Sequence, residues 1–360
     1  TYVPNILIHR EKEFEAIKSA LSEGESSTAY TAMQIIGDVG TGKTATLLKL
    51  ARDMKKENLR FAYVNPRQHG VARILIFRHI CRSLTPEVYS SSYSPEELLL
   101  TTLTKLKEDK SKGVIMIDDV DYLLLKTKEP ILYNLTRLNE LLPFENVPVA
   151  GVIFTAKNTK FRESLDRSEA SSLGNRIIVF ERYTKKQVFD IIQKRAEEAI
   201  RPGAIDEKVL EYLSEITSSP PVNGDIRYAI DVLLNAGSLC DAQNCQKITI
   251  EHIRKAVGYT SISVTQEEIS SMDQDLKKVL LAVAMALKES GEAYVSLDKI
   301  YYVYNELNKK RSIEMSKFIE ILQDLGDRGV VDIRGLTKIG ISGVPVENLT
   351  SFLEGLLDKL

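Results

Sequence analysis

The stretch from Gln34 to Thr44 constrains the fold of this 360-residue chain most, because an apolar strand pattern passes there into a glycine-rich turn and then into a helical pattern. The stretch matches G-x-x-x-x-G-K-[ST] in full, starting at Gly37. Backbone N–H groups can wrap a phosphate only where no side chain keeps it away, so the pattern predicts a need for glycine at Gly37, Gly40 and Gly42. The turn is therefore expected to bind the phosphates of a nucleotide.

The helix expected from Lys43 to Lys56 would point the positive end of its dipole at those phosphates. Lys43 is expected to reach the β and γ oxygens, and the Thr44 hydroxyl is expected to bind Mg²⁺. The expected contacts to ATP or ADP are completed by other residues of the turn and the first helical turn, namely Val39, Thr41 and Thr46. The alternative is a structural glycine turn without a ligand.

A second motif ends the apolar run that begins at Gly113, where Asp118 and Asp119 follow one another. Acids at the carboxyl end of a strand partner a phosphate loop in nucleotide hydrolases. Asp118 is predicted to hold Mg²⁺, directly or through water, and Asp119 to polarise the attacking water. The alternative is that both acids only cap a buried strand.

Strand and helix patterns alternate up to about Arg182, with strands expected over 32–36, 60–65, 113–117, 147–155 and 176–180. This order predicts an α/β domain over 1–182, with a parallel sheet covered on both faces. Residues 183–257 show four helical stretches and no strand, which predicts an all-α lid domain, and the polar segment 258–271 reads as a linker. Residues 272–360 show three helical stretches and then a hairpin at 329–341, which predicts a winged helix.

Composition bounds the class of protein. The chain is 43% apolar and 27% charged, as expected for a soluble globular protein, and no apolar run approaches membrane-spanning length. Without a signal pattern, a cytoplasmic location with no membrane partner is expected. Cys81, Cys240 and Cys245 are odd in number and lack metal-ligand spacing, which favours reduced thiols. The net charge of −2 implies that any nucleic-acid surface is local.

One such surface is expected between Asn58 and Pro86, which contain no acid between them. The candidate DNA contacts in this stretch are arginines that a solvated helix face could also explain: Arg67, Arg73, Arg78 and Arg82. The expected recognition helix, from about Glu314 to Asp327, is a poor surface because its one lysine is outnumbered by acids. The candidate contacts of the winged helix, mostly to phosphate, are Lys309, Lys310, Arg311, Lys317, Arg334 and Lys338.

Taken together, the chain resembles the archaeal origin-recognition and cell-division-cycle initiator family, AAA+ ATPases that bind replication origins. Besides the phosphate loop, the resemblance rests on fragments spread over nearly the whole chain: Tyr2–Pro4, His9–Glu11, Tyr63–Asn65, Lys160–Glu163, Ser171–Leu173, Ile178–Phe180, Gly224–Arg227 and Ile248–His252. It implies a nucleoid-associated, ATP-dependent replication initiator that binds double-stranded origin DNA of the cell, with other initiator paralogues and the replicative helicase as partners.

The resemblance also implies roles for single residues. Arg227 matches the lid's sensor, which reaches the γ-phosphate and reports whether ATP or ADP is bound. Tyr183 and Arg195 match positions that line the nucleotide, and Val3 and Pro4 match an adenine contact. Each also has an ordinary structural explanation: a solvated arginine, a core tyrosine or a simple extended segment.

The chain departs from the family pattern at several positions. Relatives commonly have Asp-Glu where this chain has Asp118 and Asp119, and the shorter aspartate predicts slow Mg²⁺-dependent ATP hydrolysis that serves as a switch. The polar residue that ends the fourth strand is Lys157 or Asn158, and Arg167 lies one residue before the expected trans-acting arginine. Two alternatives stay open: a protein-remodelling or clamp-loader-like AAA+ ATPase, and a signalling NTPase whose winged helix binds protein.

Overall fold

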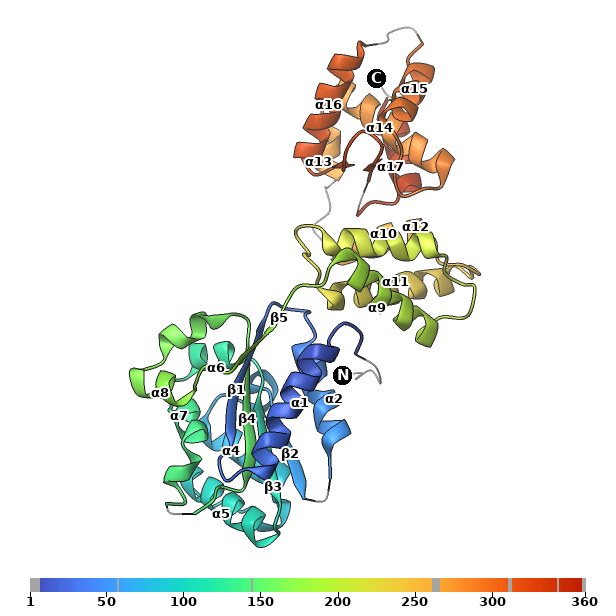
Figure 1. Cartoon of the computed structure of the whole chain (residues 1–360). Coiled ribbons are helices and arrows are strands. Elements are labelled where there is room, and N and C mark those ends of the chain that lie inside the picture. Colours follow the sequence, from blue (N-terminus) through green and yellow to red (C-terminus); the bar gives the residue numbers. More distant parts are fainter. Residues whose placement is uncertain are drawn as a thin grey trace. The chain divides into compact units, whose positions relative to one another are not determined.

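The structure is a computed structural model that describes residues 7–56, 58–143, 145–260, 266–309, 313–341 and 343–357. The chain divides into two compact units, Thr1–Gln187 and Val188–Leu360, which are described separately below (Figure 1). Four residues with predicted roles, Val3, Pro4, Lys310 and Arg311, lie outside the described residues.

The first unit is built on a five-stranded parallel sheet in the order β2-β3-β4-β1-β5, as the alternating pattern predicted. Its strands are β1 (Thr31–Gly37), β2 (Leu59–Val64), β3 (Lys112–Ile117), β4 (Val149–Ala156) and β5 (Ile177–Phe180). The eight residues of β4 are all buried, because β4 is central and helices cover both of its faces.

Two groups of helices cover the sheet, and each group has its own apolar core (Figure 1). The helices α1 (Glu11–Ser26) and α2 (Lys43–Met54) pack Ile17, Leu21 and Leu47 on one face. The other face carries α4 (Arg73–Leu84), α5 (Pro95–Glu108), α6 (Val120–Lys126) and α7 (Ile131–Thr136). Shorter helices complete the unit: α3 (Pro66–His69), α8 (Arg167–Ser172), η1 (Pro86–Val88), η2 (Leu138–Glu140) and η3 (Thr159–Ser164).

Parallel strands bring their carboxyl ends to one edge of the sheet, and this edge positions the two sequence motifs. The glycine-rich turn follows β1, and Asp118 follows β3. Asn65 follows β2, and Thr155 is the residue before the last in β4. The strand β4 lies between the two strands that carry the motifs. Polar side chains from all these strands therefore converge on one region.

The second unit begins within the first of the four helices that the sequence predicted, which are α9 (Lys185–Ala199), α10 (Glu207–Ser218), α11 (Ile226–Ala242) and α12 (Ile250–Thr260). The C-terminal group holds α13 (Gln266–Ser271), α14 (Gln274–Ser290), α15 (Leu297–Leu307), α16 (Met315–Asp327), the antiparallel pair β6 (Asp332–Ile333) and β7 (Ile339–Gly340), and α17 (Val346–Leu357). The hairpin was predicted, but α17 was not. The helices α12 and α13 also take up the two ends of the segment that was expected to be a linker.

Arg254 on α12 joins the four-helix group to the C-terminal group within this unit. Its side chain is 1% exposed and donates hydrogen bonds to the backbone carbonyls of Ile341 at 3.0 Å, Ala293 at 2.9 Å and Glu292 at 3.2 Å. Its positive charge is balanced by an ion pair with Glu251. A buried guanidinium is tolerated only when its donors are satisfied, so these contacts must stay together.

Among the residues that the structure describes, no helix combines the length and apolar character that a membrane-spanning segment requires.

We expect Arg254→Ala to destabilise the second unit by about 3 to 5 kcal/mol, because three buried or partly buried carbonyls lose their donor and a cavity forms. Hydrogen exchange of the Val295 amide, which donates to Ile339 at 2.9 Å in the same region, should accelerate, and the melting temperature should fall. Lys247→Ala, which removes only a surface ion pair with Asp206, is the control and should leave both unchanged. Equal exchange in the two variants would contradict the joining role of Arg254.

Candidate functional site

The glycine-rich turn is held open by its own backbone and by Lys43. The Lys43 ammonium donates to the carbonyl oxygens of Gly37 and, at 2.8 Å, Asp38. Gly42 has φ +93°, and a Cβ there would lie 2.8 Å from the Tyr183 hydroxyl. A Cβ on Gly37 would lie 2.5 Å from a β5 carbonyl oxygen. Glycine is required at these two positions by the packing of the turn, whatever it binds.

The other predicted residues of the turn differ in their surroundings. Val39 is 53% exposed at the tip of the turn. The buried Thr41 and Thr46 donate their hydroxyls to backbone carbonyls of the turn, at Asp38 (2.8 Å) and Gly42 (2.9 Å). These two hydroxyls therefore shape the loop.

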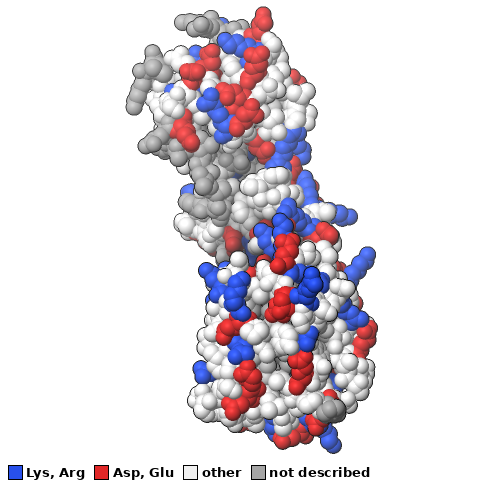
Figure 2. Space-filling view, turned by 90° about the vertical axis from the view of Figure 1, so that its left-hand side faces the viewer, with Lys and Arg blue, Asp and Glu red and all other residues white. Residues whose placement is uncertain are grey.

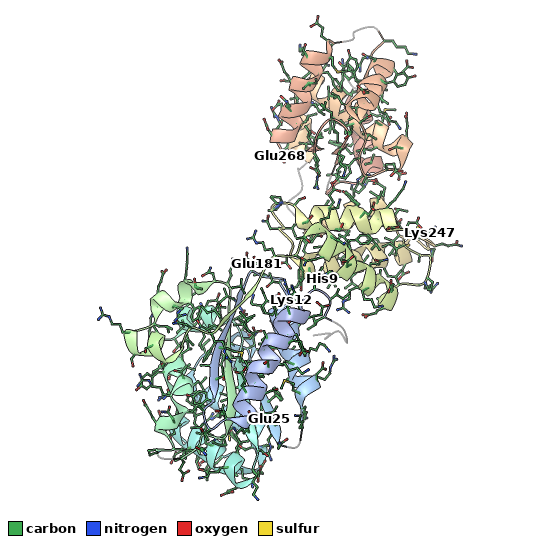
Figure 3. The ribbon with its side chains drawn as sticks, viewed as in Figure 1. His9, Lys12, Glu25, Glu181, Lys247 and Glu268 are labelled. Atoms are coloured by element: carbon green, nitrogen blue, oxygen red, sulfur yellow. The ribbon has the colours of Figure 1, made fainter. Side chains whose placement is uncertain are left out.

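Arg10 fastens the turn to the end of β5, a role that the sequence analysis missed. It is 3% exposed, its Nε donates to the Thr41 carbonyl at 2.9 Å and the Tyr183 hydroxyl at 3.1 Å, and its guanidinium carbon lies 4.1 Å from the centre of the Tyr183 ring. It also donates to the Glu181 carbonyl. Figure 3 labels the neighbours His9 and Glu181 at this end of the unit. Its place in the His9–Glu11 fragment was the available signal.

Asp118 accepts hydrogen bonds from residues that follow or end three different strands. It is 1% exposed, and its Oδ2 accepts from the Thr44 hydroxyl at 2.8 Å and the Tyr63 hydroxyl at 2.7 Å, with the Asn65 amide at 3.5 Å. Its Oδ1 accepts from the Thr155 hydroxyl. Burial, reinforced by this carboxylate, raises the pKa of Tyr63, so the phenol stays a donor.

The Thr44 hydroxyl and the Asp118 carboxylate offer only oxygen atoms, 2.8 Å apart and next to the lysine of the turn. Hard oxygen donors with one carboxylate and room for phosphate are what Mg²⁺ prefers. The donor set therefore fits the ion predicted from the sequence, with Thr44 and Asp118 as the residues that would hold it.

Asp119 lies beside this pair and starts α6 in a left-handed conformation, with φ +53°. Its N–H donates to the Thr155 hydroxyl at 3.0 Å, and its Oδ2 accepts from the Arg67 Nε at 3.3 Å. Burial, followed by the charges of Asp118 and Asp121, raises the pKa of Asp119, while Arg67 opposes that rise. The residue is thus a carboxylate whose pKa is moved toward the range of a general base.

Thr155, in the fourth strand, contacts both acids of the site. Lys157 or Asn158 was predicted to be the polar residue that ends this strand, and its role stays a prediction. The exposed Asn158 accepts from the Lys160 N–H at 3.0 Å and caps η3, while Lys157 is also exposed. Thr155 is 0% exposed and bonds both adjacent acids. It was placed inside the predicted strand, so its inward direction was not recognised.

The arginines between Asn58 and Pro86 are paired with groups from outside that stretch. Arg67 bonds Asp119, Arg73 lies 2.6 Å from Glu96, Arg78 donates to the Ser91 carbonyl at 3.0 Å, and Arg82 stacks on Tyr89. The expected excess of positive charge is therefore reduced, because distant segments supply acids. On the face drawn in Figure 2, positive and negative side chains are interspersed.

The remaining predicted residues lie in the second unit or on exposed helix starts. Arg227 is exposed in the first turn of α11, and Arg195 lies 2.7 Å from Glu198. Lys309 pairs with Glu306 and Lys317 approaches Asp275 at 3.9 Å. Arg334 and Lys338 both contact Glu215 on α10, at 3.3 Å. Arg167 is exposed at the start of α8. The predicted roles of these residues, in nucleotide or DNA binding or as a trans-acting arginine, stay predictions.

Comparison with known families matches three parts of the chain. Residues 28–165 match the family described as AAA domain, and residues 189–258 match the Cdc6 AAA+ ATPase-type lid domain. Residues 267–340 match the CDC6 C-terminal winged helix domain. The three matches follow the order in which the sheet, the four helices and the C-terminal group occur.

Similar proteins extend this likeness over nearly the whole chain. An ORC1-type DNA replication protein 1 of Sulfurisphaera tokodaii is 29% identical over 343 residues, covering 94% of this chain and 84% of that protein. An ORC1-type DNA replication protein of Pyrococcus horikoshii is 26% identical, covering 94% and 82%. The crystal structure of Cdc6p from Pyrobaculum aerophilum has a TM-score of 0.84 at 26% identity, covering 100% of this chain and 96% of that one. The Aeropyrum pernix ORC1 protein in complex with DNA has a TM-score of 0.62 at 25% identity, with the same coverage.

We expect Thr155→Val to lower the stability of the first unit by about 1 to 3 kcal/mol, because the Asp119 N–H and one Asp118 oxygen lose a buried partner without a change in volume. Hydrogen exchange of the Asp119 amide and thermal unfolding measure the effect. Thr155→Ser keeps the hydroxyl and is the matched control. A valine variant that exchanges and melts like the wild type would remove Thr155 from the site.

Proposed function

The chain belongs to the Cdc6/Orc1 family of AAA+ ATPases, and from that premise we propose that it is a replication initiator whose grip on origin DNA depends on bound ATP or ADP. The observation that carries the proposal is the Thr44–Asp118 contact at 2.8 Å beneath a complete phosphate loop. This arrangement supplies backbone N–H groups, an ammonium group and a hard-cation site at one place, as a nucleoside triphosphate with Mg²⁺ requires.

Nucleotide binding would use contacts that already exist in the turn. Lys43 donates to the carbonyls of Gly37 and Asp38, and it would exchange these neutral acceptors for charged phosphate oxygens. Hydrogen bonds between charged partners are stronger than those to neutral carbonyls, so the exchange favours binding. A magnesium ion, once bound, neutralises charge on the phosphates. Thr44 and Asp118 would hold that ion, and Tyr63 and Asn65 would orient Asp118.

Hydrolysis is proposed to be slow and to rest on Asp119. Its carboxylate would accept a proton from the attacking water, which requires the deprotonated form. Two features limit proton transfer to Asp119. Its side chain is one methylene shorter than that of glutamate, and its Oδ2 already accepts a hydrogen bond from the Arg67 Nε at 3.3 Å. Water must compete with that contact, so long-lived nucleotide states suited to a switch are expected.

The switch itself is proposed to involve the lid helices. Arg227, exposed in the first turn of α11, would sense the γ-phosphate with its planar donors. Tyr183 and Arg195 would line the nucleotide, and a trans-acting arginine, Arg167 or one from a paralogue, would complete the ATP site. The resulting state would control DNA binding and the recruitment of the replicative helicase.

DNA binding is proposed because the ORC1 protein of Aeropyrum pernix, which is similar to this chain over its full length, was solved with DNA. Exposed cations of the winged helix, such as Lys309 and Lys317, would contact phosphates. Each already has an acid nearby, so affinity should be moderate and should fall steeply with salt. Partner initiators or DNA deformation would supply the remaining specificity.

A second candidate function is supported by the charge of α16. Arg328 forms two hydrogen bonds with Asp324, at 2.9 and 3.0 Å, and the helix also presents Glu320 and Asp327. An acidic helix suits a basic protein partner better than a DNA groove. In this alternative the ATPase remodels or loads proteins, and the winged helix binds them.

The deciding prediction concerns Lys43→Ala in the full chain. We expect it to reduce ATP and ADP retention at least about a hundredfold, because the phosphates lose their ammonium partner, and to make affinity for origin-length duplex DNA independent of added nucleotide. Equilibrium dialysis with labelled nucleotide and DNA anisotropy at two salt concentrations measure the two effects.

Lys49→Ala, from the same helix, is the matched control. Nucleotide retention by Lys43→Ala would contradict the phosphate site. If the DNA affinity of the wild type changes with neither nucleotide nor salt, the result would instead favour the protein-binding alternative. The assignment of ATPase activity would not be affected.

We also expect Arg67→Ala to move the acid limb of ATP hydrolysis to higher pH. Asp119 acts as a base only when ionised, so the rate falls as pH drops through its raised pKa. Removing Arg67, which lowers that pKa, raises it further, so the variant loses activity at a higher pH than the wild type does.

Steady-state hydrolysis from mildly acidic to neutral pH measures this shift. Asp119→Asn should lower the rate by about 10² to 10⁴ and abolish the limb. Arg201→Ala, an exposed arginine of the second unit, is the charge-matched control. An unshifted limb in Arg67→Ala would assign the titrating group elsewhere.

A further inference from the structure

Three potential metal ligands gather where α11 turns into α12. Cys240 is buried near the end of α11, Cys245 is exposed in the connecting loop, and His252 is buried in the first turn of α12. One ligand atom from each lies within 4.8 Å of the other two. Across the described ranges they are the one group of three such side chains close enough to share an ion. The cysteines alone have no metal-ligand spacing along the sequence, and the fold brings a histidine next to two of them.

The loop is built so that the two sulfurs face the same space. Asn244 adopts a left-handed conformation, with φ +55°, which turns the chain back on itself. The Cys245 N–H then donates to the Cys240 carbonyl at 2.9 Å, and the Cys240 thiol donates to the Cys245 carbonyl at 3.4 Å. Figure 3 labels Lys247, two residues further along, at this end of the helix pair. The loop thus holds its cysteines together without a bond between them.

His252 presents one ring nitrogen to the loop and the other to its own helix. Its Nδ1 accepts from the Thr249 N–H at 3.0 Å and lies 2.9 Å from the Thr249 hydroxyl. Its Nε2 lies 3.2 Å from the amide oxygen of Gln243, and that same oxygen is 3.8 Å from the Cys245 sulfur. A polar oxygen atom therefore already lies between the imidazole and a thiol.

We propose that Cys240, Cys245 and His252 bind one Zn²⁺ ion, with the Gln243 amide oxygen in the fourth position. Two thiolates and an imidazole suit this borderline-soft cation and do not suit Mg²⁺ or Ca²⁺. The site is distinct from the phosphate loop and does not depend on nucleotide binding.

Proton balance supports this ligand set. Both thiols release a proton to solvent, so the two thiolates neutralise the double charge of the ion. The imidazole stays neutral: Nε2 gives its proton up to bind the metal, and Nδ1 takes one. Nδ1 then donates to the Thr249 hydroxyl and gives up the hydrogen bond that it accepts from the Thr249 N–H in this structure. That hydroxyl orients the ring, as outer partners of zinc-bound histidines commonly do.

The distances between the ligand atoms need only a small adjustment for a tetrahedral site. With Zn–S bonds of about 2.3 Å, ligand atoms in a tetrahedral site are about 3.3 to 3.8 Å apart. The observed upper limit of 4.8 Å therefore requires the group to close by roughly 1 Å. Cys245 can supply that movement because it is exposed in the loop, while Cys240 and His252 are held by their helices.

A zinc ion here would tie α11 to α12 across the loop. The helix α11 carries Arg227 in its first turn, and α12 carries the buried Arg254 that joins the C-terminal group. Ion binding to the folded state would stabilise this pair by mass action, and its removal would loosen both helices at once.

The test uses the reduced, nucleotide-free full chain titrated with Co²⁺ and then with Zn²⁺ against a chromophoric chelator. We expect one ion per chain, a thiolate-to-cobalt charge-transfer band with the intense visible bands of a tetrahedral site, and a higher melting temperature with Zn²⁺. Cys245→Ser should weaken Zn²⁺ binding at least about tenfold and remove much of the charge-transfer band.

Two further variants complete the design. His252→Gln should weaken binding similarly, and Cys81→Ala, which removes a thiol of the first unit, should leave the cobalt spectrum unchanged. If His252→Gln loosens the start of α12, the exposed Cys245 still provides the test. Absence of the charge-transfer band, equal affinity in Cys245→Ser, or a Cys240–Cys245 disulfide that persists in reductant with Zn²⁺ present would each overturn the proposal.

Discussion

The carboxylate of Asp118 is the interaction on which the rest of the first unit depends. It is buried, and its donors come from different parts of the fold: Thr44 from α2, Tyr63 from β2, Asn65 from the residue that follows β2, and Thr155 from β4. A buried charge is stable only while such donors surround it. The strand order, with β4 between β3 and β1, brings them together. The fold and the site therefore depend on the same strand positions, because a shift of one of these strands would leave the buried Asp118 carboxylate without a hydrogen-bond donor.

The sequence predicted whatever depends on local pattern. The turn from Gly37 to Thr44 and the acids at Asp118 and Asp119 were found because their spacing along the chain is the signal. The five parallel strands followed from apolar runs that alternate with helical ones. The helix α17 was not predicted, because three helical stretches and a hairpin already account for a winged helix and α17 follows that hairpin.

Contacts between distant residues could not be predicted in the same way. Arg10 and Tyr183 are 173 positions apart, and nothing in their neighbourhoods shows that they meet. The stretch after Asn58 predicts a local excess of positive charge because it lacks acids, whereas Glu96 and Asp119 pair with Arg73 and Arg67 in the fold. Charge patterns along a sequence count only local neighbours, and ion pairs in a folded protein form in space.

The β6–β7 hairpin of the C-terminal group shows how such ion pairs can limit contact with DNA. Arg334 and Lys338 both contact Glu215 on α10, whose side chain is only 13% exposed. A DNA phosphate that approached these cations would have to replace a partly desolvated carboxylate, and the carboxylate would then need another partner. Glu215 of α10 would therefore compete with a phosphate for the same two cations. A movement that separated α10 from this hairpin would remove Glu215 from both cations, while Arg334 would keep its ion pair with Asp332 at 2.9 Å. The charge that the hairpin offers to a phosphate therefore depends on the packing of α10.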